Sequence, residues 1–166
     1  MTNDCPARTP GDIAAIRIVE EIAFGRRDEA RLVDDLRAAG DAVFSLVAVD
    51  DGIVAGHAMF SRMKAPFPAL ALGPVAVLPE YRRTGIASRL IRQGIARSDA
   101  AGWAGIFVLG DPAFYRRFGF DVGKAREFTS PYAGPHLMVL PIGGSELPIA
   151  AGLIEYTPAF ASLEKP

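Results

Sequence analysis

The stretch from residue 70 to residue 109 constrains this chain of 166 residues most strongly, because it reads as a strand, a helix and a second strand. Residues 70–77 are rich in Val, Leu and Ala. Residues 85–101 place apolar side chains on one helical face and basic ones on the other. Residues 106–109 are wholly apolar, as in a strand that is buried on both faces. The order predicts a βαβ unit with parallel strands.

The rest of the chain adds helices and antiparallel strands to this unit. Asp51-Gly52 separates two β-rich runs and is a strong hairpin signal. Gly73-Pro74 interrupts the strand over residues 70–77, where it implies a bulge or a bend. A short edge strand is allowed before Thr9, and the tail after Ile142 has no clear pattern. We expect helices over residues 9–24, 28–39 and 111–118, and further strands over residues 43–49, 53–60, 120–122 and 137–140.

Composition excludes several classes of protein. Hydrophobic residues make up 50% of the chain and charged residues 22%, which argues against disorder. The net charge of -1 gives no global basic excess for nucleic acid or an anionic membrane. The uncharged run over residues 65–79 is too short and too rich in proline to span a bilayer, and the start does not resemble a signal peptide. We expect a single cytoplasmic domain over residues 1–166, either an enzyme or a binding module.

Cysteine and histidine are too few for a disulfide or a metal centre. Cys5 stands alone, so an internal disulfide is excluded, and we expect an inert terminal thiol there. His57 and His136 are the two histidines. Two isolated histidines and one cysteine do not make a metal site, so we expect none.

A turn that carries basic residues and a glycine leads directly into the helix over residues 85–101. The first turn of a helix has unpaired N–H donors and a partial positive charge. Gly85 lets a ligand approach the backbone closely, small Ala87 avoids a clash, and two arginines add full charges. These features predict a site for a diphosphate-sized anion. Its residues are Arg82, Arg83, Thr84, Gly85, Ile86 and Ala87.

The pattern of this turn distinguishes between kinds of nucleotide site. The chain has no Gly-x-x-x-x-Gly-Lys-Ser/Thr string, and the turn lacks the three glycines of a dinucleotide fingerprint. Arg82-x-x-Gly85-x-Ala87 instead resembles the pyrophosphate-binding motif of the GCN5-related N-acetyltransferases (GNAT), which use acetyl-CoA. The sequence from Phe114 to Phe120 is similar to the second motif of that family, an aromatic-Tyr-x-x-x-Gly-Phe string. The resemblance covers nearly the whole chain and is strongest to a bacterial branch of predicted acetyltransferases.

The resemblance implies a fold and a binding site. The fold would be α+β, with a mixed, mostly antiparallel twisted sheet, one βαβ crossover and helices on both faces. The strand over residues 70–77 would diverge from the strand over residues 106–109, and pantetheine would pair with the backbone of Val75 and Val77. Gly73-Pro74 would keep the strands apart. Acetyl-CoA would be the cosubstrate, and the acceptor a small-molecule or protein amine.

The resemblance also implies direct transfer in a ternary complex, without an enzyme nucleophile. We expect no Ser-His-Asp arrangement and no well-placed cysteine. Tyr115 would act as the general acid for the CoA thiolate, because the tyrosine of the second motif often has that role. Some relatives carry a glutamate eleven residues ahead of the first motif, but Ala71 stands there. His57, Glu21 and Asp111 are the remaining candidates for a proton relay.

Simpler interpretations stay open beside these. Tyr115 belongs to an aromatic cluster that is able merely to pack, and Asp111 is better placed as a helix cap than as a base. Arg89, Arg92 and Arg97 form a solvated helix face from which one could reach the 3′-phosphate of CoA. The chain could also be a non-catalytic CoA-binding or sensing module, or an interaction domain that binds no nucleotide. Edge strands would allow a homodimer.

Overall fold

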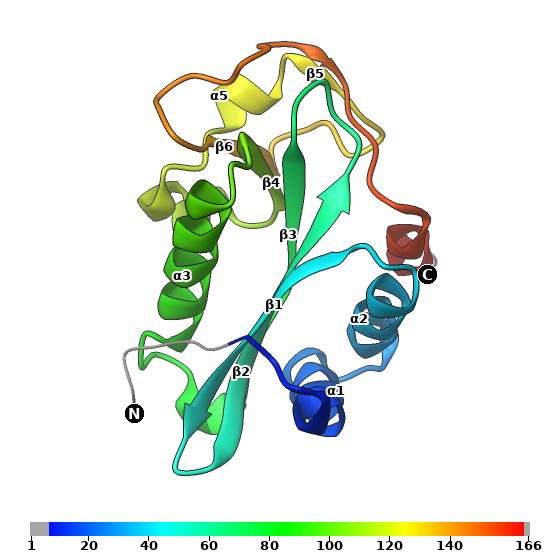
Figure 1. Ribbon diagram of the computed structural model, residues 1–166, viewed down its shortest axis with the longest axis vertical. Helices are drawn as coiled ribbons and strands as arrows, with labels where there is room; N and C mark the ends of the chain where they lie inside the picture. The colour runs from blue at the N-terminus through cyan, green and yellow to red at the C-terminus, as the bar shows by residue number, and fades with distance from the viewer. Residues whose placement is uncertain (1–6, 165–166) are drawn as a thin grey trace. The chain divides into compact units, whose positions relative to one another are not determined.

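The structure is a computed structural model that describes residues 7–164 (Figure 1). The helices are α1 Ile13–Phe24, α2 Asp28–Ala38, α3 Ile86–Ala100, α4 Pro112–Tyr115 and α5 Val122–Ala125. The strands are β1 Ala42–Asp50, β2 Ile53–Met63, β3 Ala69–Val77, β4 Gly105–Leu109, β5 Phe128–Thr129, β6 Leu137–Pro141 and β7 Gly152–Leu153. Short 3₁₀ turns cover Pro10–Asp12, Pro79–Tyr81, Arg116–Phe118 and Pro158–Glu164.

Five strands form one sheet in the order β1-β2-β3-β4-β6, and β5 pairs with β7 in a separate ribbon. β1 runs antiparallel to β2, β3 parallel to β4, and β4 antiparallel to β6. The predicted α+β class, with a mixed, mostly antiparallel sheet, is therefore confirmed, and so is the βαβ unit of β3, α3 and β4. The chain forms two compact units, the first containing residues 7–61, 74–94 and 158–164 and the second residues 62–73 and 95–157.

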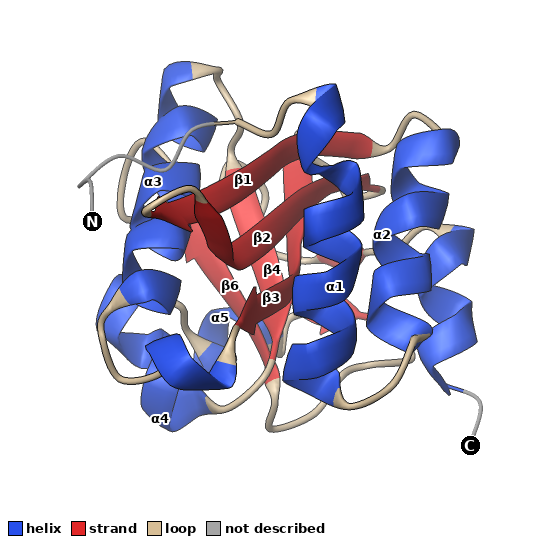
Figure 2. Ribbon diagram, turned by 90° about the horizontal axis from the view of Figure 1, so that it is seen from below, coloured by secondary structure: helices blue, strands red, loops and turns tan. Residues whose placement is uncertain are grey.

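The first unit has helices on both faces of the β1–β2 hairpin. The turn at Asp51 and Gly52 has positive φ at both residues, 49° and 78°, as the Asp-Gly signal predicts. α1 and α2 pack side by side (Figure 2) and bury an apolar stripe made up of Ile16, Val19, Leu32, Val33 and Leu36.

α3 packs on the opposite face of the same hairpin. Adjacent residues of β2 show this, because their side chains point to opposite faces of the sheet. His57 of β2 contacts Glu20 of α1, whereas a side chain at the next position, Gly56, would collide with Ile86 of α3. The absence of a side chain at Gly56 thus allows α3 to lie close to the sheet.

The second unit is built around β4, which is buried between two neighbours. Residues 105–108 of β4 pair with residues 69–72 of β3. All five residues of β4 pair with the five residues of β6. Phe67, Phe107 and Phe128 pack edge to face or stacked at centroid distances of 5.4–6.2 Å and close the core.

Gly73 stands where the register between β3 and β4 ends. Its φ of 146° lies in a region that side chains rarely adopt, so glycine is required there. β3 itself continues to Val77, and the boundary between the two units falls between Gly73 and Pro74. The irregularity predicted at Gly73-Pro74 is present at this point of β3.

One predicted strand is absent from the structure, and another lies mostly outside the described residues. Residues 120–122 are not a strand: Asp121 forms one isolated bridge to Val139 and then caps α5 by accepting a hydrogen bond from the Lys124 N–H. Residues 1–6, including Cys5, lie outside the described residues; of the predicted edge strand, Ala7 makes an isolated bridge to Leu46. Within residues 7–164, no helix has the length and apolar character needed to cross a bilayer.

Candidate acyl-CoA site

The loop between β3 and α3 folds as a tight, locally bonded turn in the first unit. Pro79 begins a 3₁₀ turn, and the Thr84 hydroxyl donates to the Tyr81 carbonyl. Two residues then adopt positive φ, Arg83 at 64° and Gly85 at 83°, which reverses the chain into α3. The first α-helical bond runs from the Arg89 N–H to the Gly85 carbonyl. The N-terminus of α3 therefore follows directly on the loop.

The loop has the properties of an anion site. Helical geometry leaves the N–H groups ahead of Arg89 without an intrahelical acceptor, and the helix dipole makes this end positive. Gly85 is exposed, and a Cβ built on it meets nothing within 4 Å. Arg82 and Arg83 are exposed as well, and the Arg82 Nη2 donates to the Ala23 carbonyl of α1 over 3.2 Å. The structure thus gathers all six predicted loop residues around one helix N-terminus.

Val75 and Val77 lie in the same unit as the loop, in the part of β3 beyond Gly73. Both are half-buried, and as alternate residues of a strand they share one face. Among the described residues, the register that joins β3 to β4 stops at Leu72 and includes neither valine. This is the arrangement expected if their backbone groups serve a ligand.

Tyr115 belongs to the second unit, where it ends α4. Its half-buried ring packs edge to face against Phe114 and Phe120, at 5.0 and 5.8 Å between centroids. A side chain at Gly110 would come within 2.5 Å of the ring, so the glycine leaves space for it. The Tyr115 hydroxyl makes no hydrogen bond to any other residue in the described part of the chain, and burial raises the pKa of the phenol. A protonated, unengaged hydroxyl is what a general acid needs.

The positions considered for a general base do not show the geometry of one. Ala71 is fully buried in β3. The Asp111 side chain caps α4 by accepting from the Ala113 N–H at 2.9 Å, as expected for a helix cap. Glu21 is half-buried on α1. None of these three positions shows a carboxylate or imidazole set up to take a proton from an amine.

His57 is held in a buried chain of hydrogen bonds. Its Nδ1 lies 2.7 Å from Glu20 Oε1, and its Nε2 lies 2.8 Å from Ser45 Oγ. This buried Ser-His-Glu chain was not anticipated from the sequence; in it, a glutamate takes the place of the aspartate of a Ser-His-Asp arrangement. Burial lowers the pKa of His57 to about 3, with the Arg37 and Arg8 charges acting in the same direction, and burial raises the pKa of Glu20. Both shifts favour the uncharged form of the side chain, and His57 is a weak base.

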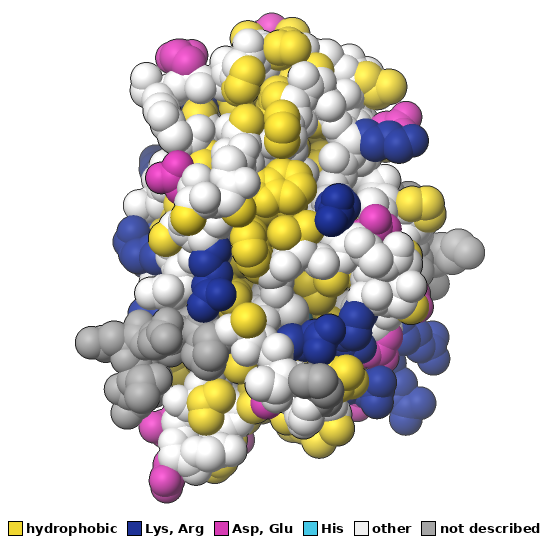
Figure 3. Space-filling view, in the orientation of Figure 1, with side chains coloured by type: hydrophobic (Ala, Val, Ile, Leu, Met, Phe, Trp, Pro, Cys, Tyr) yellow, Lys and Arg dark blue, Asp and Glu magenta, His cyan; other side chains and the backbone are white. Residues whose placement is uncertain are grey.

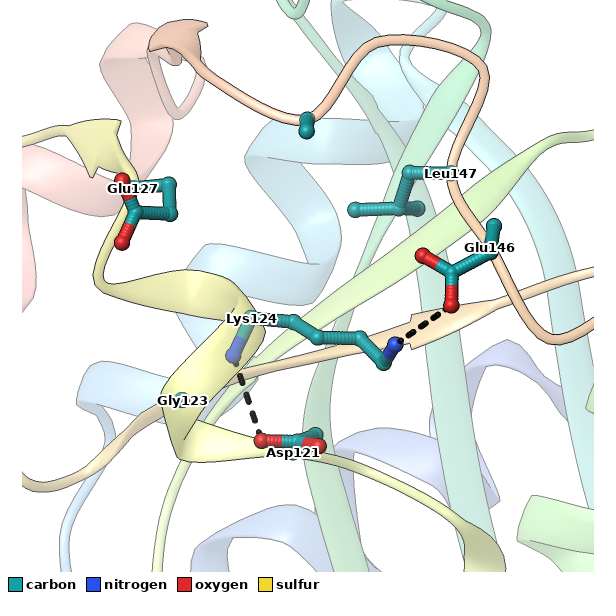
Figure 4. Close-up of a pocket in the computed structure, with 7 residues that line it drawn as sticks. Asp121, Gly123, Lys124, Glu127, Glu146 and Leu147 are labelled. Atoms are coloured by element: carbon teal, nitrogen blue, oxygen red, sulfur yellow. Dashed lines mark hydrogen bonds and ion pairs between the residues drawn. The ribbon is translucent and has the colours of Figure 1, made fainter.

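Two hollows of the second unit were not anticipated. One, of about 350 Å³, is drawn in Figure 4: Lys124 of α5 reaches across to Glu146 at 3.4 Å, and Glu127 and Leu147 form further walls. The other, of about 430 Å³, lies beside the turn that carries Tyr115 and is lined by Pro112, Arg116, Gly119, Phe120, Asp121, Val122 and Met138. Each hollow is lined by segments that are separated in the sequence, and no sequence motif connects these segments.

In the part of the chain that the structure describes, the distribution of charged side chains and of possible metal ligands indicates no additional binding site. On the face drawn in Figure 3, Lys and Arg side chains lie among acidic and apolar ones. Arg89, Arg92 and Arg97 of α3 each already interact within the chain. Among the described residues, no three His, Cys, Asp or Glu side chains are grouped so that they could hold a metal ion.

Comparison with known proteins shows which family the chain resembles. The acetyltransferase (GNAT) family matches residues 13–120. The uncharacterized N-acetyltransferase YhbS of Escherichia coli K12 is 33% identical over 159 residues, which is 92% of this chain and 93% of that protein. The uncharacterized N-acetyltransferase YjhQ of the same organism is 38% identical over 133 residues, 75% of this chain and 73% of its own.

Solved structures agree with the sequences. The crystal structure of Escherichia coli YhbS in complex with CoA superimposes with a TM-score of 0.89 at 31% identity, covering 95% of this chain and 91% of that one. A GNAT acetyltransferase from Brucella melitensis in complex with acetyl-CoA gives 0.80 at 37% identity, covering 95% and 97%. The resemblance found in the two sequence motifs is confirmed: the chain belongs to the acetyltransferase (GNAT) family of enzymes.

Proposed function

We propose that the chain transfers an acetyl group from acetyl-CoA to a primary amine by direct attack in a ternary complex. The observation that carries this proposal is the loop of residues 82–87, which combines a helix N-terminus, two exposed arginines and open space over Gly85. Family membership supports it, as do the two relatives crystallised with CoA and acetyl-CoA.

The residues of the loop have distinct roles in this proposal. The backbone N–H groups around Gly85, Ile86 and Ala87 bind the diphosphate, while Arg82 and Arg83 add charge and Thr84 fixes the turn. The backbone of Val75 and Val77 holds the pantetheine arm. Acetyl-CoA supplies the activated thioester, and no covalent enzyme intermediate is required.

Tyr115 is the general acid in this proposal. The thiol of CoA resembles that of cysteine, whose pKa is about 8.5, and in this proposal the departing thiolate takes its proton from the Tyr115 phenol. Burial raises the pKa of Tyr115, so the hydroxyl carries its proton at neutral pH. The amine must lose a proton before it attacks, since a free alkylamine has a pKa of about 10.4.

A CoA-binding or sensing module without catalysis is the second candidate. It is favoured by the buried Ala71, by the weak basicity of His57 and by the capping role of Asp111, which together leave the base unassigned. The two candidates share the loop and differ only in turnover.

One experiment separates the candidates. Acetyl-CoA is titrated into the protein by calorimetry, and release of free CoA thiol is then followed with a library of primary amines, including peptides with free N-termini and lysines. Binding with amine-dependent thiol release is expected. Tight binding with no turnover on any amine would favour the sensing module, and absence of binding would refute both.

Two coarser features of the chain stay predictions. We infer that residues 1–166 form a single acyltransferase domain, so both compact units should unfold in one cooperative transition. A cytoplasmic location and a homodimer are expectations from sequence; light scattering would test the second.

A further inference from the structure

The buried chain of Glu20, His57 and Ser45 is the most unusual polar feature of the first unit. The same residue types form the catalytic chain of serine hydrolases. Here, however, Glu20 and His57 have no exposed surface and Ser45 has 8%. A nucleophile must reach its substrate, so the arrangement is a poor hydrolytic site. Its role must be sought in what it connects.

The chain joins three elements at one point. Glu20 comes from α1, Ser45 from β1 and His57 from β2. The second carboxyl oxygen of Glu20, Oε2, is buried without a hydrogen-bond partner. If α1 slid along the sheet, the carboxyl would lose its contact with His57 and become wholly unpaired, which is costly in a buried setting. The bond to His57 therefore fixes the register of α1 on the hairpin.

One turn further along α1, the helix contacts the loop that carries the diphosphate motif. The Ala23 carbonyl, three residues after Glu20, accepts a hydrogen bond from Arg82 Nη2 at 3.2 Å. Ala23 lies in the last turn of α1, where carbonyls have no intrahelical donor and the helix dipole is negative, so it attracts a guanidinium. The position of this carbonyl follows directly from the register of α1.

We propose that Glu20 is a positioning residue for acetyl-CoA binding, which acts through the Ala23 carbonyl on the Arg82 side chain. The inference rests on the proposed function of the loop. Two consecutive links carry it: His57 sets the register of α1, and the register sets the point at which Arg82 is held. Glu20 touches no ligand in this account.

The test compares two acyl donors with the same acetylpantetheine arm, of which only acetyl-CoA also carries the diphosphate and the 3′-phosphoadenosine. Acetyl-CoA contains the diphosphate, whereas S-acetylpantetheine lacks it. Glu20→Ala should weaken acetyl-CoA binding by about tenfold, the scale of one perturbed hydrogen bond to a charged group. It should leave S-acetylpantetheine binding within about twofold by the same reasoning. Glu20→Gln, which still bonds to His57, should recover most of the loss, and Glu21→Ala is the matched control on α1.

A double-mutant cycle tests the route through Arg82. In an Arg82→Ala background, Glu20→Ala should cost little further acetyl-CoA affinity, because the side chain through which it acts is gone. Additive losses would overturn the proposal, and so would equal losses for the two donors. If Glu20→Ala fails to fold, Glu20→Asp, which shortens the reach to His57, should give the same pattern at smaller size; no difference between the donors for that variant would refute the inference.

A measurement without ligand separates this inference from the proposed function. In the free protein, Glu20→Ala should speed amide hydrogen exchange at residues 82–85 relative to Glu21→Ala, and unchanged exchange would overturn the positioning role. If the wild-type protein binds no acetyl-CoA, the proposed function fails and the binding role of Glu20 fails with it. If the wild-type protein binds but the cycle is additive, only the inference fails.

Discussion

Removing one oxygen atom from Tyr115 should separate its packing from its chemistry. In Tyr115→Phe the ring keeps its edge-to-face contacts with Phe114 and Phe120. The hydroxyl has no hydrogen-bond partner among the described residues, so none is left unsatisfied. The free energy of unfolding should change by less than about 0.5 kcal/mol. If the phenol is the general acid, kcat should fall about 100-fold or more.

The assay is thiol release from acetyl-CoA with the best amine of the screen, together with urea unfolding and a binding titration. The Kd for acetyl-CoA should stay unchanged, because the hydroxyl acts on the leaving thiolate and not on the diphosphate. Tyr132→Phe, which removes another phenolic oxygen from the second unit, is the control and should keep full activity. A Tyr115→Phe enzyme with kcat within about threefold of wild type would refute the acid role.

Gly110→Ala perturbs the same tyrosine without changing it. The new methyl group would lie 2.5 Å from Cε2 of the ring, so Tyr115 has to move. Displacements of about 1 Å at a reacting group can cost about 100-fold in rate, and the shift expected here is a fraction of that. We therefore expect a fall of about tenfold in kcat, measured in the same thiol assay. Unchanged turnover in this variant would mean that the exact position of the phenol does not matter.

Two further predictions concern stability. Asp111→Ala should lower the free energy of unfolding by about 1 kcal/mol, because the Ala113 N–H loses its cap, and urea denaturation checks this; a large loss of activity at unchanged stability would instead mark Asp111 as catalytic. The Glu20–His57 pair predicts a pH dependence. The pKa of Glu20 is raised and that of His57 is about 3, so above pH 4.5 the folded pair keeps one proton, on Glu20, up to the raised pKa of that carboxyl. The unfolded chain also holds one proton between pH 4.5 and 6.5, on its histidine. Above pH 6.5 the unfolded histidine loses its proton, so stability should fall by up to about 1.4 kcal/mol per pH unit over the range in which the raised pKa of Glu20 keeps its carboxyl protonated in the folded chain. Below pH 4.5 the unfolded chain takes up a second proton and stability should fall again. Urea unfolding of Glu20→Gln should show no such loss above pH 6.5; the same slope in both proteins would contradict the assignment.

The turn of residues 82–87 and the helix that follows it were predictable because their determinants are contiguous. An apolar strand, a proline turn, a glycine and an amphipathic helix follow one another within residues 75–101, and each is a local preference. The parallel pairing of β3 and β4 follows from the same segment, since a crossover helix imposes it. The irregularity at Gly73 was visible because glycine and proline have few roles inside a strand.

What escaped prediction depends on contacts distant in sequence. Glu20 and His57 are 37 positions apart, and nothing in either neighbourhood shows that α1 will place the carboxyl on β2. β5 and β7 have two residues each, too few for a periodic pattern. At Asp121 the apolar residues beside it suggested a strand, whereas the acidic side chain was the signal of a helix cap.

The central claim is that the backbone at Gly85 receives the diphosphate of acetyl-CoA. Gly102, at the other end of α3, offers a matched control, because its φ of 84° and its empty surroundings reproduce those of Gly85 at 83°. Gly85→Gln and Gly102→Gln should therefore lose similar stability, about 1–2 kcal/mol of backbone strain each. Calorimetric titration with acetyl-CoA should show binding weakened at least about 100-fold in Gly85→Gln alone, since a side chain there displaces the anion from its N–H donors. Equal affinities in the two variants would contradict the account.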